Sequence, residues 1–526
     1  MGANQNTSHT INEDERTEFT HHINSQLAGD KDVGDKLPIP THTMQLFDEC
    51  RDGLILSKLI NDAVPDTIDE RVLNTGKKMN QFKMIENNNI VINSAKAIGC
   101  SVVNIGPNDI MEGREHLILG LIWQIIKRGL LSKIDIKLHP ELYRLLEEDE
   151  TLDEFLRLPP DQILLRWFNY HLKAANWQRR VTNFSKDVSD GENYTILLAQ
   201  LGADRGITRA PLQEKDLLKR AEMVLQNADK LNCRKYLSPK SLVAGNPKLN
   251  LAFVANLFNT HPGLDPLSEE EAPEIEPFDA EGEREARGGS WVKYWDKIFT
   301  LWLNSLDVDP GVYNLFEDLK DGLIILQAFE KVIPTSVNWR LVSRKQPLSR
   351  FKQIENCNYA VTLGTHHRFT LVNIQGADIV DGNRTLTLGL VWQLMRENII
   401  QTLESLSKGG KHITDRDMIK WANDTVAKGG KSSKINGFKD AGLRSGIFFL
   451  DLLNGIRPGV VDYGMVTRGV SDDDAYNNAK LAISIARKIG ATIFLVPEDI
   501  VEVRSKMNLT FIGSLMVVDR SGTAGK

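Results

Sequence analysis

One stretch of this chain occurs twice, and that duplication constrains the fold more than any single motif does. The first copy opens with Asp-Gly-Leu-Ile-Leu at residue 52, passes through Phe-Lys-Met-Ile-Glu-Asn at 82 and closes on Leu-Gly-Leu-Ile-Trp-Gln at 119. Residues 321–393 repeat this order, each matching residue lying 269 positions later without a gap. Each copy therefore predicts one structural module, and the chain must be assembled from such modules.

A second pair of related segments accompanies the first. Residues 231–257 match residues 489–515 at an offset of 258 without a gap, and both carry an Asn-Leu-x-Phe-(Val/Ile) sequence, at 250 and at 508. A chain of 526 residues is too long for one core and predicts roughly three to five domains. The predicted order is A-B-A′-B′, which makes four modules in two tandem pairs.

The segments between the repeats set the predicted boundaries. Residues 269–285 hold nine acidic side chains together with Pro273, Pro277 and Gly282, a composition that cannot bury enough apolar surface to fold alone. We therefore predict a disordered tail at 1–11, a linker at 136–158 and an acidic linker at 267–289. Modules 1 to 4 are predicted at 12–135, 159–266, 290–406 and 412–522; modules 1 and 2 form the first tandem, and modules 3 and 4 form the second.

The apolar pattern predicts helices throughout. In the segment 82–98, Ile85, Ile92, Ala95 and Ile98 recur at three- and four-residue steps, as on one face of a helix. Gly99 follows at the position where a left-handed helix end is expected. No segment shows a convincing alternation of apolar and polar residues, so we predict an all-α protein.

The composition argues against several classes of protein. The net charge of −6, from 64 basic and 70 acidic side chains, argues against nucleic acid as a partner. No apolar run reaches the ~20 residues needed for membrane insertion across a bilayer, and the first residues lack the apolar core of a signal peptide. The four cysteines show no Cys-x-x-Cys spacing, which suits reduced, buried thiols in the cytoplasm.

Catalytic and metal-binding motifs are missing from the sequence. Gly430-Lys431-Ser432 resembles the end of a phosphate-binding loop, but Thr425 stands where that loop requires glycine. The histidine pairs at 21–22 and 366–367 are adjacent in sequence, so neither pair places two ligands on one helix face. We expect no enzyme activity, no metal and no other cofactor.

The closing helix of module 1 has a broad apolar side. At 3.6 residues per turn, Ile118, Leu119, Ile122, Ile125 and Ile126 share one side of the segment 117–128, with Trp123 at its edge. Burial of such a face stabilises a fold by about 1.5–3 kcal/mol per large side chain. We therefore expect Trp123, and Trp392 in the second copy, to lie in the core.

The opposite strip of the same helix is polar and contains a glycine. Leu117, Gly120, Gln124, Lys127 and Arg128 lie along it. A glycine inside a helix costs about 1 kcal/mol relative to alanine, so its presence suggests that something approaches the backbone there. The spacing leaves open whether this is another helix of the same chain or a partner.

At this point the motifs resemble a known family. The Asp-Gly-Leu helix start, the Phe-Lys-x-Ile-Glu-Asn helix and the Leu-Gly-Leu-x-Trp-Gln ending are similar to calponin-homology modules of the first type, and the Asn-Leu-x-Phe endings to modules of the second type. Two such tandems in one chain resemble the fimbrin (plastin) family over residues 14–520.

This resemblance implies actin-filament binding and cross-linking of two F-actin filaments into tight bundles by a monomer of the actin cytoskeleton. In the family, the first and closing helices of the odd module and the first helix of the even module form the binding surface. Within these elements we take the following positions. The first half supplies Arg16, His21, Asn24, Leu117, Gly120, Gln124, Lys127, Arg128, Arg166, Asn169 and Lys173. The second half supplies Lys293, Lys297, Asn304, Leu386, Gly389, Gln393, Arg396, Lys420 and Asn423.

Two departures from the family pattern matter. Lys127-Arg128 becomes Arg396-Glu397 in the second half, so the two surfaces should differ in charge. Family members also resemble one another in an EF-hand headpiece, for which this sequence gives no motif: Asp30 could open a calcium loop, but Thr41 replaces the required glutamate. An alternative function is a scaffold that binds microtubules or signalling partners, because a fold does not fix a partner.

Overall fold

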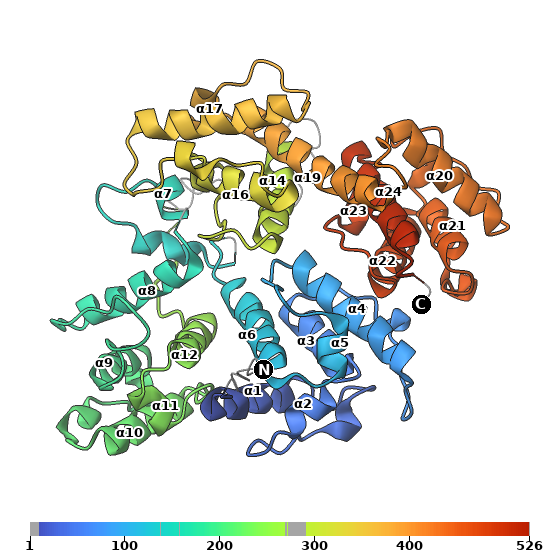
Figure 1. Ribbon diagram of the computed structural model, residues 1–526. Coiled ribbons are helices and arrows are strands. Elements are labelled where there is room, and N and C mark those ends of the chain that lie inside the picture. The colour runs from blue at the N-terminus through green and yellow to red at the C-terminus, as the bar shows by residue number, and fades with distance from the viewer. Residues whose placement is uncertain (1–9, 137, 157, 269–270, 272–290, 525–526) are drawn as a thin grey trace, which may run out of the picture. The chain divides into compact units, whose positions relative to one another are not determined.

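The computed structural model describes residues 10–136, 138–156, 158–268, 271 and 291–524. These residues form helices and connecting loops with no strand (Figure 1), which confirms the all-α prediction. None of the helices in the described ranges is both long and apolar enough to cross a bilayer.

The helices repeat in the predicted order (Figure 1). Module 1 contains α1 (Glu13–Gln26), α2 (Gln45–Glu49), α3 (Leu54–Ala63), α4 (Gln81–Ala97), α5 (Pro107–Met111) and α6 (Glu115–Leu131), and α7 (Leu152–Leu156) follows it. Module 2 contains α8 (Pro160–Ala174), α9 (Glu192–Leu201), α10 (Leu217–Lys230), α11 (Pro239–Val243) and α12 (Pro247–Thr260).

Modules 3 and 4 repeat these two patterns. Module 3 contains α14 (Trp291–Ser305), α15 (Leu315–Asp318), α16 (Leu323–Val332), α17 (Arg350–His366), α18 (Gly376–Val380) and α19 (Arg384–Leu406). Module 4 contains α20 (Asp415–Lys428), α21 (Ile447–Ile456), α22 (Asp472–Lys488), α23 (Pro497–Val501) and α24 (Ser505–Ser521).

The duplicated motifs have a common structural cause. Gly53 precedes α3 with φ +78°, and a Cβ there would lie 2.6 Å from Asn88 Oδ1. Only glycine combines this left-handed conformation with so close an approach. The side-chain amide of Asn87, the last residue of the second motif, donates to the carbonyl of Asp52 at 2.9 Å. The first two motifs are therefore two sides of one contact.

The second copy repeats this contact. Gly322 has φ +77°, and the buried Asn356 donates to the carbonyl of Asp321 at 3.0 Å. Asn356 also bridges the loop at Ser343, with which it exchanges two hydrogen bonds of 2.8 and 3.0 Å. The repeated order of the two motifs thus reflects a tertiary contact, which joins the start of α3 to α4 and the start of α16 to α17.

Contacts between Cα atoms group the chain into two compact units, and the boundary passes through module 1. Unit 1 comprises residues 1–51, 62–64 and 113–288, and unit 2 comprises residues 52–61, 65–112 and 289–526. Unit 1 therefore holds the first and closing helices of module 1 together with module 2. Unit 2 holds the middle of module 1 together with modules 3 and 4.

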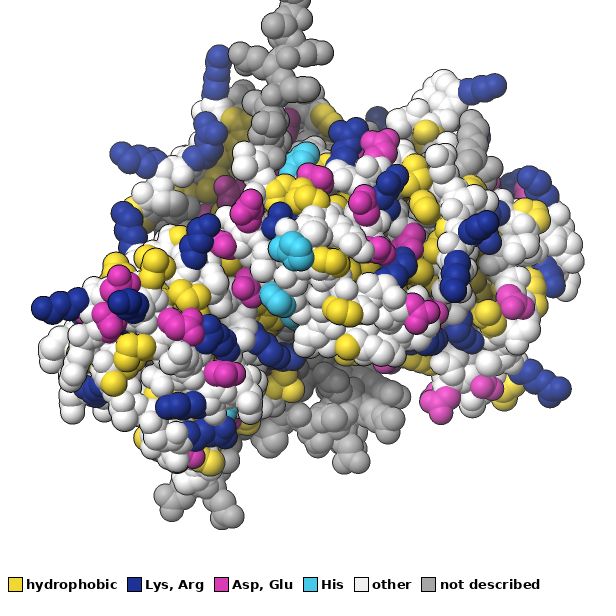
Figure 2. All heavy atoms as spheres, turned by 90° about the horizontal axis from the view of Figure 1, so that it is seen from below, with side chains coloured by type: hydrophobic (Ala, Val, Ile, Leu, Met, Phe, Trp, Pro, Cys, Tyr) yellow, Lys and Arg dark blue, Asp and Glu magenta, His cyan; other side chains and the backbone are white. Residues whose placement is uncertain are grey.

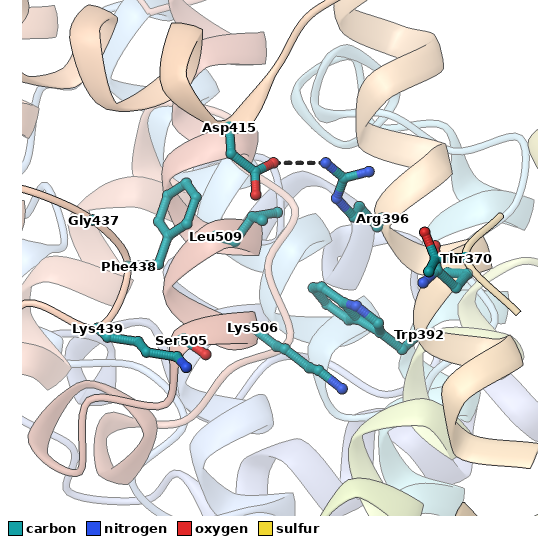
Figure 3. A pocket seen from close by; sticks show the side chains of 11 residues that line it. Thr370, Trp392, Arg396, Asp415, Gly437, Phe438, Lys439, Ser505, Lys506 and Leu509 are labelled. Atoms are coloured by element: carbon teal, nitrogen blue, oxygen red, sulfur yellow. Dashed lines mark hydrogen bonds and ion pairs between the residues drawn. The ribbon is translucent and has the colours of Figure 1, made fainter. Parts of the chain in front are cut away.

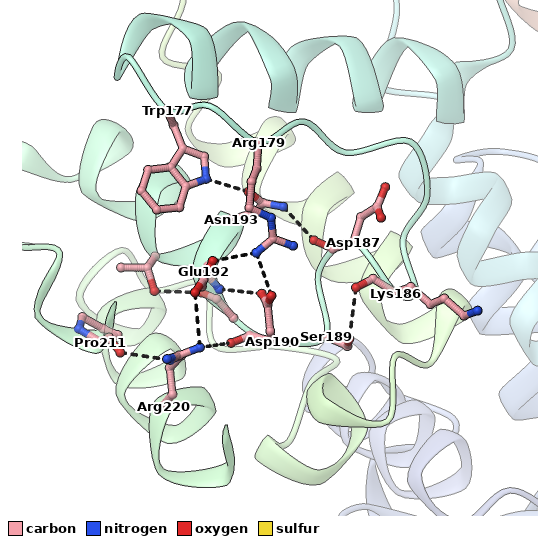
Figure 4. A network of polar contacts seen from close by, with 12 residues as sticks. Trp177, Arg179, Lys186, Asp187, Ser189, Asp190, Glu192, Asn193, Pro211 and Arg220 are labelled. Carbon is pink, nitrogen blue, oxygen red and sulfur yellow. Dashed lines mark hydrogen bonds and ion pairs between the residues drawn. The ribbon is translucent and has the colours of Figure 1, made fainter. Parts of the chain in front are cut away.

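A charged network in unit 1 holds the long loop of module 2 in place (Figure 4). Arg179 donates to the carboxylates of Asp190 and Glu192 at 2.6 and 2.7 Å, and Arg220 donates to the backbone carbonyl of Asp190 at 2.9 Å. Trp177 donates to Asn193 at 2.9 Å. These bonds join residues 177–190 to the starts of α9 and α10.

The middle of module 1 packs on module 4 inside unit 2, where α22 lies beside α4. Lys488 Nζ donates to the carbonyl of Val72 at 2.7 Å, and the side-chain amide of Asn93 donates to the carbonyl of Arg487 at 3.1 Å. Glu86 and Arg457 form an ion pair of 2.6 Å, and the Glu86 carboxylate is only 6% exposed. This contact joins residues that are almost 400 positions apart in sequence.

Candidate filament-binding surfaces

The closing helices divide into a buried and a solvent-facing side as predicted. Trp123 and Trp392 are each 7% exposed, and Trp123 stacks on Phe19 with ring centroids 5.8 Å apart. Both tryptophans are therefore core residues. Leu117, Gln124 and Lys127 lie half-buried along the opposite side of α6.

The two strip glycines face open space. Gly120 is exposed, and a Cβ built at Gly120 or at Gly389 would meet no atom within 4 Å in the described residues. Packing against the described residues therefore does not account for a glycine at either position. That a partner approaches the backbone there stays a prediction.

Arg396 of the second strip forms an ion pair. Arg396 Nη2 lies 2.6 Å from Asp415 Oδ1 of module 4, beside a groove of about 590 Å³ that Trp392, Phe438 and Lys506 also line (Figure 3). Lys127, the counterpart of Arg396, makes no such pair among the described residues. The two strips thus differ in sequence charge, and they also differ because Arg396 forms an ion pair that Lys127 does not form among the described residues.

Four asparagines that we placed on the surface have a structural role instead. Asn24 exchanges two hydrogen bonds with the backbone of Ile39, at 2.9 and 2.7 Å. Asn169 does the same with Val181, Asn304 with Val312 and Asn423 with Ile435. Each amide holds the loop that follows its own helix, so we leave all four out of the proposed surface.

Some of the other charged positions are already engaged. Arg166 pairs with Glu150 and lies 5.4 Å from the ring of Phe155, and Arg16 donates to Met44 Sδ at 3.4 Å. Lys420 pairs with Asp424 at 2.6 Å on the same helix. These contacts orient the side chains, and an exposed pair of this kind contributes little stability by itself.

The remaining predicted residues are open to solvent or lie outside the described side chains. His21, Lys173 and Lys297 are exposed, and Arg128, Leu386 and Gln393 are half-buried. The side chain of Lys293 lies outside the described residues, as do residues 1–9 of the predicted tail and most of the acidic linker.

Within unit 1, α1 and α6 contact module 2 and so combine elements of both modules. The Asn246 side chain donates to Glu15 at 3.2 Å, and Tyr236 lies in hydrogen-bond contact with His22 at 2.8 Å. Burial, reinforced by Lys235 and Lys133, lowers the pKa of His22 to about 4, so this histidine is neutral at physiological pH. The predicted elements of the first tandem are therefore brought together in one unit.

Within unit 2, the corresponding contact is aromatic. Lys506 Nζ lies 5.6 Å from the ring centroids of both Trp295 and Trp392, and burial lowers the pKa of Lys506. Our sequence reasoning missed Glu15, Trp295 and Lys506. An alignment of Phe-Thr-x-x-Ile-Asn-Ser at 19 with Phe-Thr-x-x-Leu-Asn-Ser at 299 pairs Glu15 with Trp295 and could have pointed to both.

The described residues present mixed charge at the surface and no cluster of metal ligands. Figure 2 shows basic and acidic side chains interspersed with apolar atoms on the face it presents. No group of three or more His, Cys, Asp and Glu side chains able to hold a metal ion occurs in the part of the chain that the structure describes. The structure contains two related helical surfaces, and each carries a polar and basic strip, one on α6 and one on α19.

Comparison with known proteins identifies the modules and their order. The family model of the calponin homology (CH) domain matches residues 13–130, 158–263, 295–400 and 412–521. Fimbrin of Saccharomyces cerevisiae is 67% identical over 527 residues, covering 99% of this chain and 80% of that protein. Plastin-3 of Homo sapiens is 44% identical over 528 residues, covering 98% of this chain and 81% of that protein.

A solved structure matches as well. The crystal structure of the actin-crosslinking core of Schizosaccharomyces pombe fimbrin has a TM-score of 0.82 and 59% sequence identity to this chain, covering 96% of this chain and 100% of the solved one. Four calponin-homology modules and this degree of identity over nearly the whole length leave one assignment: the chain belongs to the fimbrin family of calponin-homology proteins.

Proposed function

We propose that this chain binds actin filaments through each of its two tandems and cross-links two filaments into a tight bundle. The observation that carries the proposal is the duplication of one surface, the strip of α6, as the strip of α19 in the same molecule. The solved actin-crosslinking core of a fimbrin, which matches this chain over 96% of its length, supports the choice of actin.

The proposed surfaces keep the predicted positions other than the four asparagines. The first comprises His21, Leu117, Gly120, Gln124, Lys127, Arg128 and Lys173, and Arg16 and Arg166 flank it. The second comprises Lys293, Lys297, Leu386, Gly389, Gln393, Arg396 and Lys420. A standard interface buries about 800 Å² on each partner, an area that two adjacent helical modules can supply.

Cross-linking needs no tight site. Once one tandem is bound, the second meets a neighbouring filament at an effective concentration that is often millimolar for a short tether. We propose that the chain acts as a monomeric, non-enzymatic structural protein of the cytoplasmic actin cytoskeleton. Basic strips on an acidic filament imply binding that weakens with salt.

Co-sedimentation with actin filaments tests the proposal. High-speed pelleting measures binding, and low-speed pelleting measures bundles. We expect Lys127→Glu to weaken binding roughly tenfold, as for charge reversal within an interface. Lys219→Glu, the same reversal at an exposed position of α10 away from the surface, is the matched control and should bind like the unaltered chain. A chain that fails to pellet with filaments at low salt would exclude the function.

A further inference from the structure

The repeated Phe-Lys-x-Ile-Glu-Asn motif lies on the same face of modules 1 and 3, and the two copies of this face differ in exposure. In module 1, Val72 is 6% exposed. Phe82 is 40% exposed, and its ring centroid lies 4.8 Å from Cζ of Arg457 in module 4. The counterparts in module 3, Leu341 and Phe351, are 65% and 69% exposed. Two apolar side chains of this face are therefore open to solvent in module 3.

The charge of the face also changes between the copies. Residues 66–83 of module 1 hold four Lys and Arg side chains and three Asp and Glu side chains, a net charge of +1. Residues 335–352, the same length of chain 269 positions later, hold five Lys and Arg side chains and no acid, a net charge of +5. The acids of the first copy, Asp66, Asp69 and Glu70, are replaced by Thr335, Asn338 and Trp339.

The lost acids matter because module 4 contacts module 1 with cations. Lys480 pairs with Asp66 at 2.8 Å, and Arg457 pairs with Glu86 at 2.6 Å. In module 3, Thr335 stands at the position of Asp66. A second surface like that of module 4 would therefore meet mainly positive charge on module 3, and like charges across an interface oppose binding. The open face fits an anionic partner instead.

The loop that carries most of this charge lies along α17. The backbone N–H of Asn338 donates to the hydroxyl of Tyr359 at 2.8 Å, and the side-chain amide of Asn356 donates to the carbonyl of Ser343 at 2.8 Å. These two bonds hold the loop against the middle of α17, whose first turn carries the last cations of the segment. The loop and the start of α17 therefore form one surface.

We call this surface the basic patch. It consists of the exposed side chains of Leu341, Phe351, Arg340, Arg344, Lys345, Arg350 and Lys352. Three acids border it: Asp381 pairs with Arg350 at 2.6 Å, Asp321 accepts a hydrogen bond from Gln346 at 3.0 Å, and Glu355 lies one turn after Phe351. The five cations outnumber these acids, so the basic patch is positive although the whole chain has a net charge of −6.

We infer that the basic patch of module 3 is a docking site for membranes that contain anionic lipids. Each Lys or Arg close to an anionic leaflet strengthens binding about fivefold, and exposed Leu and Phe side chains bury at the boundary between headgroups and acyl chains. A fluid bilayer accepts single apolar side chains without the shaped, close-packed surface that a folded protein must supply. Acids elsewhere on the chain are screened beyond about 8 Å at physiological salt.

The inference adds a partner to the proposed function and does not depend on it. The basic patch is formed by α17 and the loop before it, whereas the proposed second filament surface is formed by α14, α19 and α20. A bundle that holds many copies would present many such patches, and multivalent contact strengthens weak binding.

Flotation of the whole chain with lipid vesicles, without filaments, tests the inference. Phosphatidylcholine vesicles that contain roughly one third phosphatidylserine should carry the chain with them, and vesicles of phosphatidylcholine alone should not. Binding should weaken between about 0.1 M and about 1 M sodium chloride, as the Debye length shortens from about 10 Å to about 3 Å. A chain that floats with neither kind of vesicle, or equally with both, would overturn the inference.

Matched variants separate the basic patch from the overall charge. Arg344→Gln combined with Lys345→Gln removes two exposed cations and should weaken vesicle binding roughly thirtyfold. Lys77→Gln combined with Lys78→Gln makes the same change at two exposed positions in the corresponding loop of module 1 and should bind like the unaltered chain. Equal weakening in both double variants would assign binding to overall charge and contradict the inference.

A third variant tests the apolar part of the contact. Phe351→Ser changes an exposed side chain, so folding should be preserved, and vesicle binding should weaken roughly tenfold. Urea unfolding checks the fold of every variant. The inference fails if Phe351→Ser binds vesicles as tightly as the unaltered chain. It also fails if the Arg344 and Lys345 double variant loses co-sedimentation with actin filaments but keeps vesicle binding, because the basic patch would then belong to a filament contact.

Discussion

At single positions, α6 and α19 each carry a glycine where an alanine would make the helix more stable. Gly120 and Gly389 lie inside α6 and α19 with free space at the position of a side chain. A glycine there costs about 1 kcal/mol relative to alanine, and packing within the described chain does not require it. An external backbone or side chain that approaches α6 and α19 closely would account for the two glycines.

Gly120→Ala should therefore separate stability from binding. We expect the free energy of unfolding to rise by about 1 kcal/mol, while filament affinity falls by roughly tenfold because the methyl group blocks close approach. Urea unfolding and co-sedimentation measure the two effects. Gly129→Ala on the same helix is the control, since its Cβ would lie 3.0 Å from the Ala63 Cα and should destabilise the protein. Unchanged affinity in Gly120→Ala would exclude a close contact at this site.

The carboxyl of Glu18 gives a second prediction at this scale. Burial, with a smaller contribution from Asp14, raises the pKa of Glu18 to about 7 despite the opposing charge of Arg234. A raised pKa means that folding favours the protonated form, so stability is lost as the pH rises from about 4.5 to about 7. Glu18→Gln removes this cost and should increase the free energy of unfolding by about 1–3 kcal/mol at pH 8 and by little at pH 4. Denaturant unfolding at both pH values measures the gain; an equal gain at both would assign it to packing rather than to ionisation.

At the scale of elements, one asparagine in the first helix of each module fixes the loop that follows. Asn24, Asn169, Asn304 and Asn423 each use both atoms of the amide on one residue 8 to 15 positions later. The loops are thereby held at a constant distance from their helices. This repeated device explains why the same residue type recurs on the first helix of all four modules.

Asn169→Ala should cost stability and leave the chemistry of the surface unchanged. Losing both hydrogen bonds leaves the N–H and C=O groups of Val181 without their partner, which costs about 1–3 kcal/mol of unfolding free energy. Filament affinity measured well below the melting temperature should change less than about threefold. A large loss of filament affinity in a folded Asn169→Ala protein would show that Asn169 belongs to the binding surface after all.

These elements also show how far the sequence could predict the structure. The periodicity of α4, the left-handed Gly99 at φ +92° and the buried Trp123 follow from local pattern, and each is observed. The role of Asn24 does not follow, because periodicity shows which face of a helix is polar and not which loop folds back onto it. The pairing of Arg396 with Asp415 and of Lys506 with Trp392 depends in the same way on tertiary contacts.

At the scale of the whole molecule, the duplicated architecture is asymmetric. The face of α4 in module 1 packs on α22, and Phe82 there lies 4.8 Å from the Arg457 guanidinium. The corresponding Phe351 on α17 is 69% exposed. Duplication therefore produced two similar modules that differ at this position, where Phe82 is 40% exposed beside Arg457 and Phe351 is 69% exposed.

The ion pair between Glu86 and Arg457 tests how strongly that contact stabilises unit 2. Glu86→Leu leaves the Arg457 charge in a largely buried site and should lower the free energy of unfolding by about 3 kcal/mol. Arg457→Leu should also lower the free energy of unfolding, because it leaves the buried Glu86 carboxylate without its cation. The double variant should lose less than the sum of the two single losses. Urea unfolding of all four proteins gives the coupling energy. Strictly additive losses would show that the two side chains act independently.

The contact between α4 and α22 also sets an order of events during synthesis. Asn93 can form its hydrogen bond only after Arg487, which is 394 residues further along the chain, has been made. At a translation rate of about 5–20 residues per second, the ribosome needs roughly 20–80 s to supply that partner. Throughout this interval Glu86 and Asn93 of α4 lack the partners that module 4 supplies. The part of the protein that is made first is thus among the last to be completed.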